Sequence, residues 1–136
     1  MNTFRQQTMM DKERQAALNN NRPTLSACMI VKNEEKFLSQ CLTSIKGAVD
    51  EIIIVDTGST DKTVEIAHSF GANVYHHPWN NSFSEARNHS LKYAKGDWIL
   101  QIDAGEILEQ ADIPLLHKFI NNTSYNVIFV AIYNEL

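Results

Sequence analysis

The feature that most constrains the fold is a regular alternation of short apolar runs with helix-like segments, which begins at Leu25. Apolar runs lie at 25–31, 51–55, 72–77, 97–102 and 127–133. Between them, apolar residues recur at helical spacing over 33–47, 61–71, 82–96 and 113–120. Strand–helix alternation of this kind predicts βαβ units. Because the strands are almost continuously apolar, as burial on both faces requires, we predict an α/β fold with a mostly parallel sheet and helices on both faces.

The first 22 residues differ from the rest, because they are polar and end in the Asn-rich sequence NNNRP. We expect a polar N-terminal helix or extension at 1–22 and one nucleotide-binding domain at 23–136. A chain of 136 residues, 43% of them hydrophobic, suits a single domain with a core. The N-terminus is too polar for a secretory signal and no apolar run could cross a bilayer. The expected location is the cytoplasm, with the inner membrane surface left open.

Charge and potential metal ligands exclude some classes of function. The net charge is −4 and the basic residues are scattered, which argues against a nucleic-acid partner. Cys28 and Cys41 lack the spacing of metal ligands, so we interpret them as reduced, buried thiols. His76 and His77 are adjacent on a strand and would point to opposite faces, which argues against a metal site there.

One helix carries a clear start signal. Ser82 and Glu85 have the spacing of a capping box. The helical pattern then places one apolar face on Phe83, Ala86, Leu91 and Ala94.

Polar clusters follow each of the first four strands. They are 32–34, 56–61, 76–81 and 103–106. In an open parallel sheet, ligands bind beyond the carboxyl ends of the strands, so these clusters should meet at one site. Gly58 allows a tight turn, and Ser59, Thr60 and Asp61 can cap the next helix, whose free N–H groups suit an anion. Asp56 suits a base N–H or a sugar hydroxyl, although it could instead serve only as a cap.

Asp56-Thr57-Gly58 also allows a different interpretation, an aspartic protease. A second triplet, Asp103-Ala104-Gly105, likewise follows an apolar strand. The protease is an all-β protein with two carboxylates that share a proton. The helical periodicity between the triplets, the alanine in the second one and the helix start after Gly58 all favour the α/β fold.

Four segments together carry a family resemblance: ACMIVKNEE, VDTGSTDKT, FSEARN and GDWILQIDAGE. In this order, each near a strand, they resemble the family 2 glycosyltransferases of the GT-A fold, over roughly residues 25 to 110. Within that family the chain is most similar to bacterial enzymes with a KNEE start and an A-R-N helix. The resemblance implies the Rossmann-like, nucleotide-binding half of a GT-A domain.

The resemblance also implies roles for individual residues. The nucleoside pocket would be lined by Ile30, Val31, Lys32, Asn33 and Glu34. Asp56 would accept from the nucleobase imide, which favours a uridine-type donor, and Gly58 and Ser59 beside it would also bind the nucleotide sugar. Arg87 would approach the diphosphate or the sugar, with a plain surface arginine as the alternative.

Asp103 would head the Asp-x-Asp motif that holds the ribose and a divalent metal, Mg²⁺ or Mn²⁺. This chain departs from the motif, because Gly105 stands where the second aspartate is expected. Glu106 next to it is a weak substitute ligand, since hard cations take oxygen ligands and Mg²⁺ often needs only one or two carboxylates. Metal dependence is therefore left open.

The function implied is transfer of a sugar from a nucleotide sugar, a UDP-sugar by the Asp56 argument, with inversion. The acceptor (a peptide, a lipid-linked group or a saccharide) is not specified. In the resembled family the catalytic base lies in the acceptor half, beyond Leu136, so we interpret the chain as a truncated, donor-binding half. The alternative is a non-catalytic nucleotide-binding or interaction module. The apolar run at 127–133 predicts a homodimer through an exposed edge strand.

Overall fold

The computed structural model describes residues 23–122 and 133–134. The elements, in chain order, are β1 (Leu25–Val31), α2 (Leu38–Ile45), β2 (Glu51–Asp56), α3 (Thr63–Ser69), β3 (Asn73–His76), α4 (Phe83–Tyr93), β4 (Trp98–Gln101), β5 (Glu106–Ile107), the 3-10 helix η1 (Gln110–Asp112), α5 (Ile113–Asn122) and β6 (Tyr133–Asn134). The first four predicted strands are present, and each predicted helix within 33–120 appears with ends shifted by a few residues. The helix expected at 1–22 lies outside the described residues.

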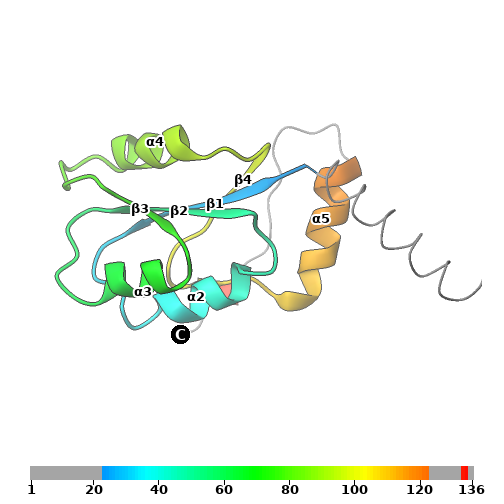
Figure 1. Ribbon diagram of the computed structural model, residues 1–136, viewed down its shortest axis with the longest axis horizontal. Helices are drawn as coiled ribbons and strands as arrows, with labels where there is room; N and C mark the ends of the chain where they lie inside the picture. The colour runs from blue at the N-terminus through cyan, green and yellow to red at the C-terminus, as the bar shows by residue number, and fades with distance from the viewer. Residues whose placement is uncertain (1–22, 123–132, 135–136) are drawn as a thin grey trace, which may run out of the picture.

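The main sheet confirms the predicted fold class. It has four strands in the order β3-β2-β1-β4, and all three pairings are parallel. Helix α4 covers one face of this sheet, and α2 and α3 cover the other (Figure 1). The mostly parallel, doubly covered sheet is what the continuously apolar strands predict.

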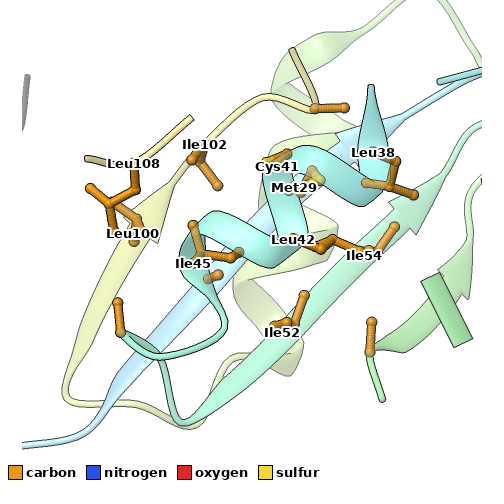
Figure 2. Packing of buried hydrophobic residues seen from close by; sticks show 14 of the residues in the cluster. Met29, Leu38, Cys41, Leu42, Ile45, Ile52, Ile54, Leu100, Ile102 and Leu108 are labelled. Atoms are coloured by element: carbon orange, nitrogen blue, oxygen red, sulfur yellow. The ribbon is translucent and has the colours of Figure 1, made fainter. Parts of the chain in front are cut away.

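The larger part of the core lies between the sheet and α2. Four residues at helical spacing on α2 are fully buried: Leu38, Cys41, Leu42 and Ile45. They face Met29, Ile54 and neighbouring side chains of the strands (Figure 2). Burial of one such side chain contributes roughly 1.5–3 kcal/mol, so this layer is what fixes α2 on the sheet.

Helix α4 packs on the opposite face through small residues, which corrects the apolar face predicted for it. Ala86 and Ser90 are buried, whereas Phe83 is 68% exposed and Leu91 is 37% exposed. The small side chains let the helix approach β1, where the Cys28 thiol donates to the Ser90 carbonyl at 4.0 Å. The helix forms where its apolar spacing predicts it, but the size of the contact residues determines which face is buried.

The start of α4 and the end of α3 follow local rules of capping. The Ser82 hydroxyl accepts from the Glu85 N–H at 3.2 Å, as the capping box predicts. At the end of α3, Gly71 has a φ of 76°, and its N–H donates to the His68 carbonyl at 3.0 Å. Glycine adopts this left-handed conformation without strain, so α3 stops there.

The amino edge of the sheet is closed by a network of hydrogen bonds. The buried Ser26 hydroxyl donates to Glu51 at 2.5 Å and accepts from the Gly96 N–H at 2.8 Å. Glu51 also accepts from the Lys95 N–H, and Asp50 accepts from the Leu25 N–H at 2.7 Å. These carboxylates are therefore part of the framework.

The thiols are free and buried, as the sequence indicated. Burial, with Glu51 nearby, raises the pKa of Cys28 to about 11, although the hydrogen bond to Ser90 opposes the shift. Burial, with Glu106 and Asp103 nearby, raises the pKa of Cys41 to about 12. Both thiols are therefore protonated and unreactive near neutral pH.

The end of the chain differs from the prediction of a fifth strand in the main sheet. Within the described residues, β6 pairs antiparallel with β5 in a separate two-stranded sheet. Residues 127–132 of the predicted strand lie outside the described residues, so an edge-strand dimer stays a prediction. None of the helices in the described ranges combines the length and apolar character that crossing a bilayer requires.

Candidate functional site

The loops that follow the parallel strands meet at one edge of the sheet. Because β1, β2 and β3 run in the same direction, their carboxyl ends and following loops lie on the same side, at the left of Figure 1. The end of β1 pairs in register with the end of β2, as Val31 is opposite Asp56. This carboxyl edge is where ligands bind in open parallel sheets.

The loop after β1 is tied to the loop after β2 by Asn33. Its N–H donates to the Ser59 hydroxyl at 2.9 Å, and its side-chain oxygen accepts from the Thr60 N–H at 2.8 Å. Asn33 has a φ of 51°, a conformation that asparagine tolerates better than most residues. Asn33 and Ser59, both predicted to contact the donor, are thus placed where they hold the two loops together.

A second set of hydrogen bonds fixes the starts of α2 and α3. The Glu34 N–H donates to the Thr63 hydroxyl at 2.8 Å, and the Lys62 N–H donates to Glu35 at 3.1 Å. Asp61 accepts from the N–H and the hydroxyl of Thr63, at 2.9 and 2.5 Å. Desolvation opposes the change, but these hydrogen bonds hold the pKa of Asp61 below its usual value. The loops therefore form a rigid rim.

Asp56 ends β2 with a buried carboxylate, of which 3% is exposed. It accepts from the N–H groups of Gly58 and Ser59 at 3.2–3.3 Å, and the His76 ring nitrogen Nδ1 lies 3.4 Å away. Gly58 has a φ of 127°, which favours glycine. Asp56 therefore closes a turn and does not cap α3, which begins at Thr63. A carboxylate offers about four acceptor sites, so it retains capacity for a ligand.

A cavity of about 260 Å³ opens at this edge. It is lined by Ile30, Val31, Lys32, Glu34, Thr57, Trp79 and Phe83. The structure thus brings four of the predicted pocket residues together, all from the end of β1 and the loop after it. Three lining residues were not among the predicted ligand contacts: Thr57, Trp79 and Phe83. Two aromatic side chains within the polar sequence PWNNSF are the signal that could have identified them.

Glu34 is the acidic residue of the cavity lining. Burial raises its pKa, and the nearby charges of Asp103 and Asp61 raise it further. The carboxylate of Asp103 therefore lies within electrostatic range of Glu34. The ends of β1, β2 and β4 therefore contribute acidic groups to one edge.

Asp103 follows β4 and is exposed, and its carbonyl accepts from the Cys41 thiol at 3.5 Å. Its N–H donates to the Glu106 carboxylate at 2.9 Å, which occupies one oxygen of that side chain in a turn. Gly105 offers no ligand, and no group of three acidic, histidine or cysteine residues in the described ranges could hold a metal ion. This donor set fits a divalent cation only with oxygens from a ligand such as a diphosphate.

Arg87, His76 and His77 do not line the cavity. Arg87 is exposed on α4, next to the buried Ala86. His76 and His77 point in different directions, as expected, since His76 lies beside Asp56 and His77 packs against the His89 ring at a centroid distance of 5.0 Å.

The family model for glycosyl transferase family 2 matches residues 26–135. The chain belongs to this family. The match covers both the loops of the carboxyl edge and every strand of the main sheet. A parallel α/β sheet with this membership is not the all-β fold of an aspartic protease, and that alternative is wrong.

Curated relatives agree with the family assignment. The chain is 50% identical over 84 residues to a TPR repeat-containing protein of Synechococcus elongatus, covering 62% of this chain and 21% of that protein. It is 44% identical to an uncharacterized glycosyltransferase of Rickettsia bellii, covering 63% and 29%. It is 40% identical to the glycosyltransferase SunS of Bacillus subtilis, covering 62% and 21%. The chain therefore spans between a fifth and a third of the length of these relatives.

Solved structures show the same GT-A fold. Glucosyl-3-phosphoglycerate synthase of Mycobacterium tuberculosis, in complex with Mn²⁺, uridine diphosphate and glucosyl-3-phosphoglycerate, has a TM-score of 0.64 and 29% identity, covering 79% of this chain and 43% of the synthase. TarS of S. aureus has a TM-score of 0.60 and 24% identity, covering 71% and 32%. The second likeness shows the fold alone.

Proposed function

We propose that this chain forms the donor-binding part of a glycosyltransferase that uses a uridine diphosphate sugar. The observation that carries the proposal is the cavity at the carboxyl edge, where apolar, aromatic and charged residues from separate loops line one space. The rim around it is held by hydrogen bonds between loops, so the site is formed before a ligand arrives. The related synthase that holds uridine diphosphate supports the choice of nucleotide.

Asp56 is the group proposed to recognise uracil. Its carboxylate lies at the end of β2, next to the cavity residue Thr57, and turn N–H groups fix its orientation. An ionised carboxylate only accepts hydrogen bonds, so it suits the imide N–H of uracil, whereas the corresponding ring nitrogen of adenine, N1, is itself an acceptor. We therefore assign the preference for uracil to Asp56.

The diphosphate is proposed to lie towards Asp103, with Lys32 and Arg87 as cations that balance its charge. A divalent ion, if bound, would be held by Asp103, more weakly by Glu106, and by phosphate oxygens. Such an ion would neutralise charge that develops on the departing diphosphate. Lys32 lines the cavity and is exposed, so it can reach an anion there without prior loss of a partner in the described part of the chain.

The reaction proposed is a single displacement with inversion. An acceptor hydroxyl attacks the anomeric carbon while the diphosphate leaves from the opposite face, and a carboxylate base removes the hydroxyl proton. The described residues supply the binding of the leaving group. No residue of the described part of the chain is assigned as the base.

Isothermal titration calorimetry with UDP, with and without Mn²⁺, tests the proposal. UDP should bind, and Asp56→Asn should weaken the binding by roughly 10-fold, because a hydrogen bond to a charged group contributes about 1.5–3 kcal/mol. Asp97→Asn is the matched control, since Asp97 accepts hydrogen bonds from Thr24 at the amino edge. Absence of heat with every uridine nucleotide would refute the proposal.

A further inference from the structure

Two exposed aromatic side chains, Trp79 and Phe83, form one wall of the cavity. Trp79 is 40% exposed and Phe83 is 68% exposed. Their ring centroids lie 4.9 Å apart at an interplanar angle of 68°, so the pair meets edge to face. Large aromatic groups are usually buried, and a pair of them left open beside a cavity marks a surface for a ligand.

The pair is held in place by hydrogen bonds rather than by core packing. The Trp79 N–H donates to the Thr57 carbonyl at 3.3 Å, and its indole nitrogen donates to Asn81 at 3.2 Å. Phe83 is the first residue of α4, whose start is fixed by the Ser82 cap. The two rings are thus oriented in advance, although neither of them belongs to the hydrophobic core.

The position of the pair relative to Asp56 indicates what it binds. The loop runs along the end of β2, because the His77 N–H donates to the Asp56 carbonyl at 2.9 Å and Trp79 bonds to the next residue, Thr57. The segment that bears the aromatic rings therefore runs beside the end of β2, where Asp56 directly precedes the cavity residue Thr57. A flat ring with a polar edge suits both the aromatic rings and Asp56.

We propose that the wall formed by Trp79 and Phe83 is the platform for the nucleobase of the donor, with the base stacked on the face of one ring and in contact with the edge of the other. The inference rests on the proposed function and adds the residues that supply affinity for the base. Stacking on an aromatic side chain contributes about 1–3 kcal/mol per base and is tolerant of base identity. The platform therefore sets how tightly a nucleotide binds, and Asp56 sets which base is preferred.

The aromatic wall offers few hydrogen-bond partners for the hydroxyl groups of the transferred sugar. The side chains of the apolar lining residues offer no hydrogen bonds to hydroxyl groups, apart from the indole N–H of Trp79, which is already bonded to Asn81; these four residues are Ile30, Val31, Trp79 and Phe83. The charged lining residues Lys32 and Glu34 lie on the loop after β1, and Glu34 is close to Asp103. The polar sugar and phosphates match that loop, which leaves the aromatic wall for the base.

Tryptophan fluorescence provides a direct test, because the chain has two tryptophans, Trp79 and Trp98. In a Trp98→Phe variant of the 136-residue chain, the emission reports on Trp79 alone. Uridine monophosphate and UDP should quench it, whereas pyrophosphate, which has no base, should leave it unchanged. In the matched Trp79→Phe variant, the emission of Trp98 on β4 should not respond to any of the three.

Phe83→Ala tests the second ring. It should weaken binding of both UDP and ADP by about 10-fold, the middle of the range for one stacked base, and leave pyrophosphate binding unchanged. Leu91→Ala is the control, because Leu91 is an exposed apolar residue of the same helix that does not line the cavity. Asp56→Asn should instead weaken UDP without weakening ADP.

These measurements distinguish failure of the base-stacking proposal from failure of the proposed donor-binding function. UDP binding that is unchanged by Phe83→Ala, with no quenching of Trp79, would overturn the platform and leave the donor site standing. Quenching by pyrophosphate equal to that by UDP would also overturn it, because the rings would then not report a base. No binding of any nucleotide by the parent chain would overturn both proposals.

Discussion

Acidic residues lie at both edges of the parallel sheet, and the two edges use them differently. At the amino edge, Glu51 accepts from Ser26 and Lys95, and Asp50 accepts from the Leu25 N–H. At the carboxyl edge, Asp56, Asp61 and Glu35 also accept N–H groups of the loops. By contrast, no hydrogen bond within the described part of the chain reaches the carboxylates of Glu34 or Asp103. Burial raises the pKa of Glu34, and the nearby negative charges of Asp103 and Asp61 raise it further.

This difference indicates which acidic groups serve the fold and which serve a ligand. A carboxylate that accepts N–H groups from neighbouring loops stabilises the loops, and its removal leaves donors without partners. Acidic groups placed together without such donors destabilise the free protein slightly, and a cation or a hydrogen-bond donor from a ligand can offset that. Substitutions at the two edges should therefore separate stability from binding.

The largest effect should come from Gly96→Ala at the amino edge. A Cβ atom there would lie 2.5 Å from the Ser26 hydroxyl oxygen and 2.8 Å from the Ser26 backbone nitrogen. Because the backbone must shift, we expect a loss of about 3 kcal/mol in the free energy of unfolding, measured by urea denaturation. Gly105→Ala is the carboxyl-edge counterpart, with no atom within 4 Å of its Cβ, and should change stability little. Equal losses would contradict the comparison.

The next effect compares two serines. Ser26→Ala removes a fully buried hydroxyl that donates to Glu51 and accepts from Gly96, so we expect a loss of about 2 kcal/mol. Ser59→Ala removes an acceptor of the exposed Asn33 N–H, which water can replace, and should cost less than about 1 kcal/mol. Thermal unfolding followed by circular dichroism measures both, and a larger loss for Ser59→Ala would reverse the ranking.

A third substitution should affect binding without affecting stability. Asp103→Asn removes a charge that no described residue stabilises, so the unfolding midpoint should stay within about 0.5 kcal/mol of the parent. UDP binding in the presence of Mn²⁺ should weaken by roughly 10-fold, and the difference should shrink when EDTA replaces the metal. Calorimetry in both buffers measures this, and the same loss with and without metal would remove Asp103 as a ligand.

The smallest effect concerns pH. Because folding raises the pKa of Glu34 above its ordinary value of 4.5, its ionisation is less favourable in the folded chain than in the unfolded chain. The contribution of Glu34 to the free energy of unfolding is fully present below pH 4.5. It is lost as the pH rises through the pKa that Glu34 has in the folded chain. Glu34→Gln should therefore raise stability slightly at pH 7, with the gain absent at pH 3.5. Urea midpoints at the two pH values test this, and a loss at pH 7 would contradict the sign.

The fold followed from the sequence because its signals are local and periodic. Continuous apolar runs such as Leu25–Val31 gave the parallel strands, and the Ser82–Glu85 spacing gave the start of α4. The buried face of α4 did not follow, because helical spacing does not show that Ala86 and Ser90, rather than Phe83 and Leu91, fit closely against the sheet. Side-chain size against a partner is a property of the packed structure.

The site was only partly predictable for a similar reason. The clusters after each strand identified the carboxyl edge, since parallel strands bring their ends together. The sequence did not indicate that Asn33 and Ser59 bond to each other, nor that Trp79 and Phe83 meet over the cavity. These contacts join different loops, and their partners become neighbours only once the sheet has formed.

A map of where UDP contacts the protein tests most directly the claim that the donor binds at the carboxyl edge. Amide chemical shifts of the ¹⁵N-labelled chain, recorded during a UDP titration, report both edges at once. Changes should be concentrated at Val31 to Glu34, Thr57 and Trp79, and the shifts of Ser26, Glu51 and Gly96 should stay constant. Changes confined to the amino edge, or spread evenly over the sheet, would contradict that claim.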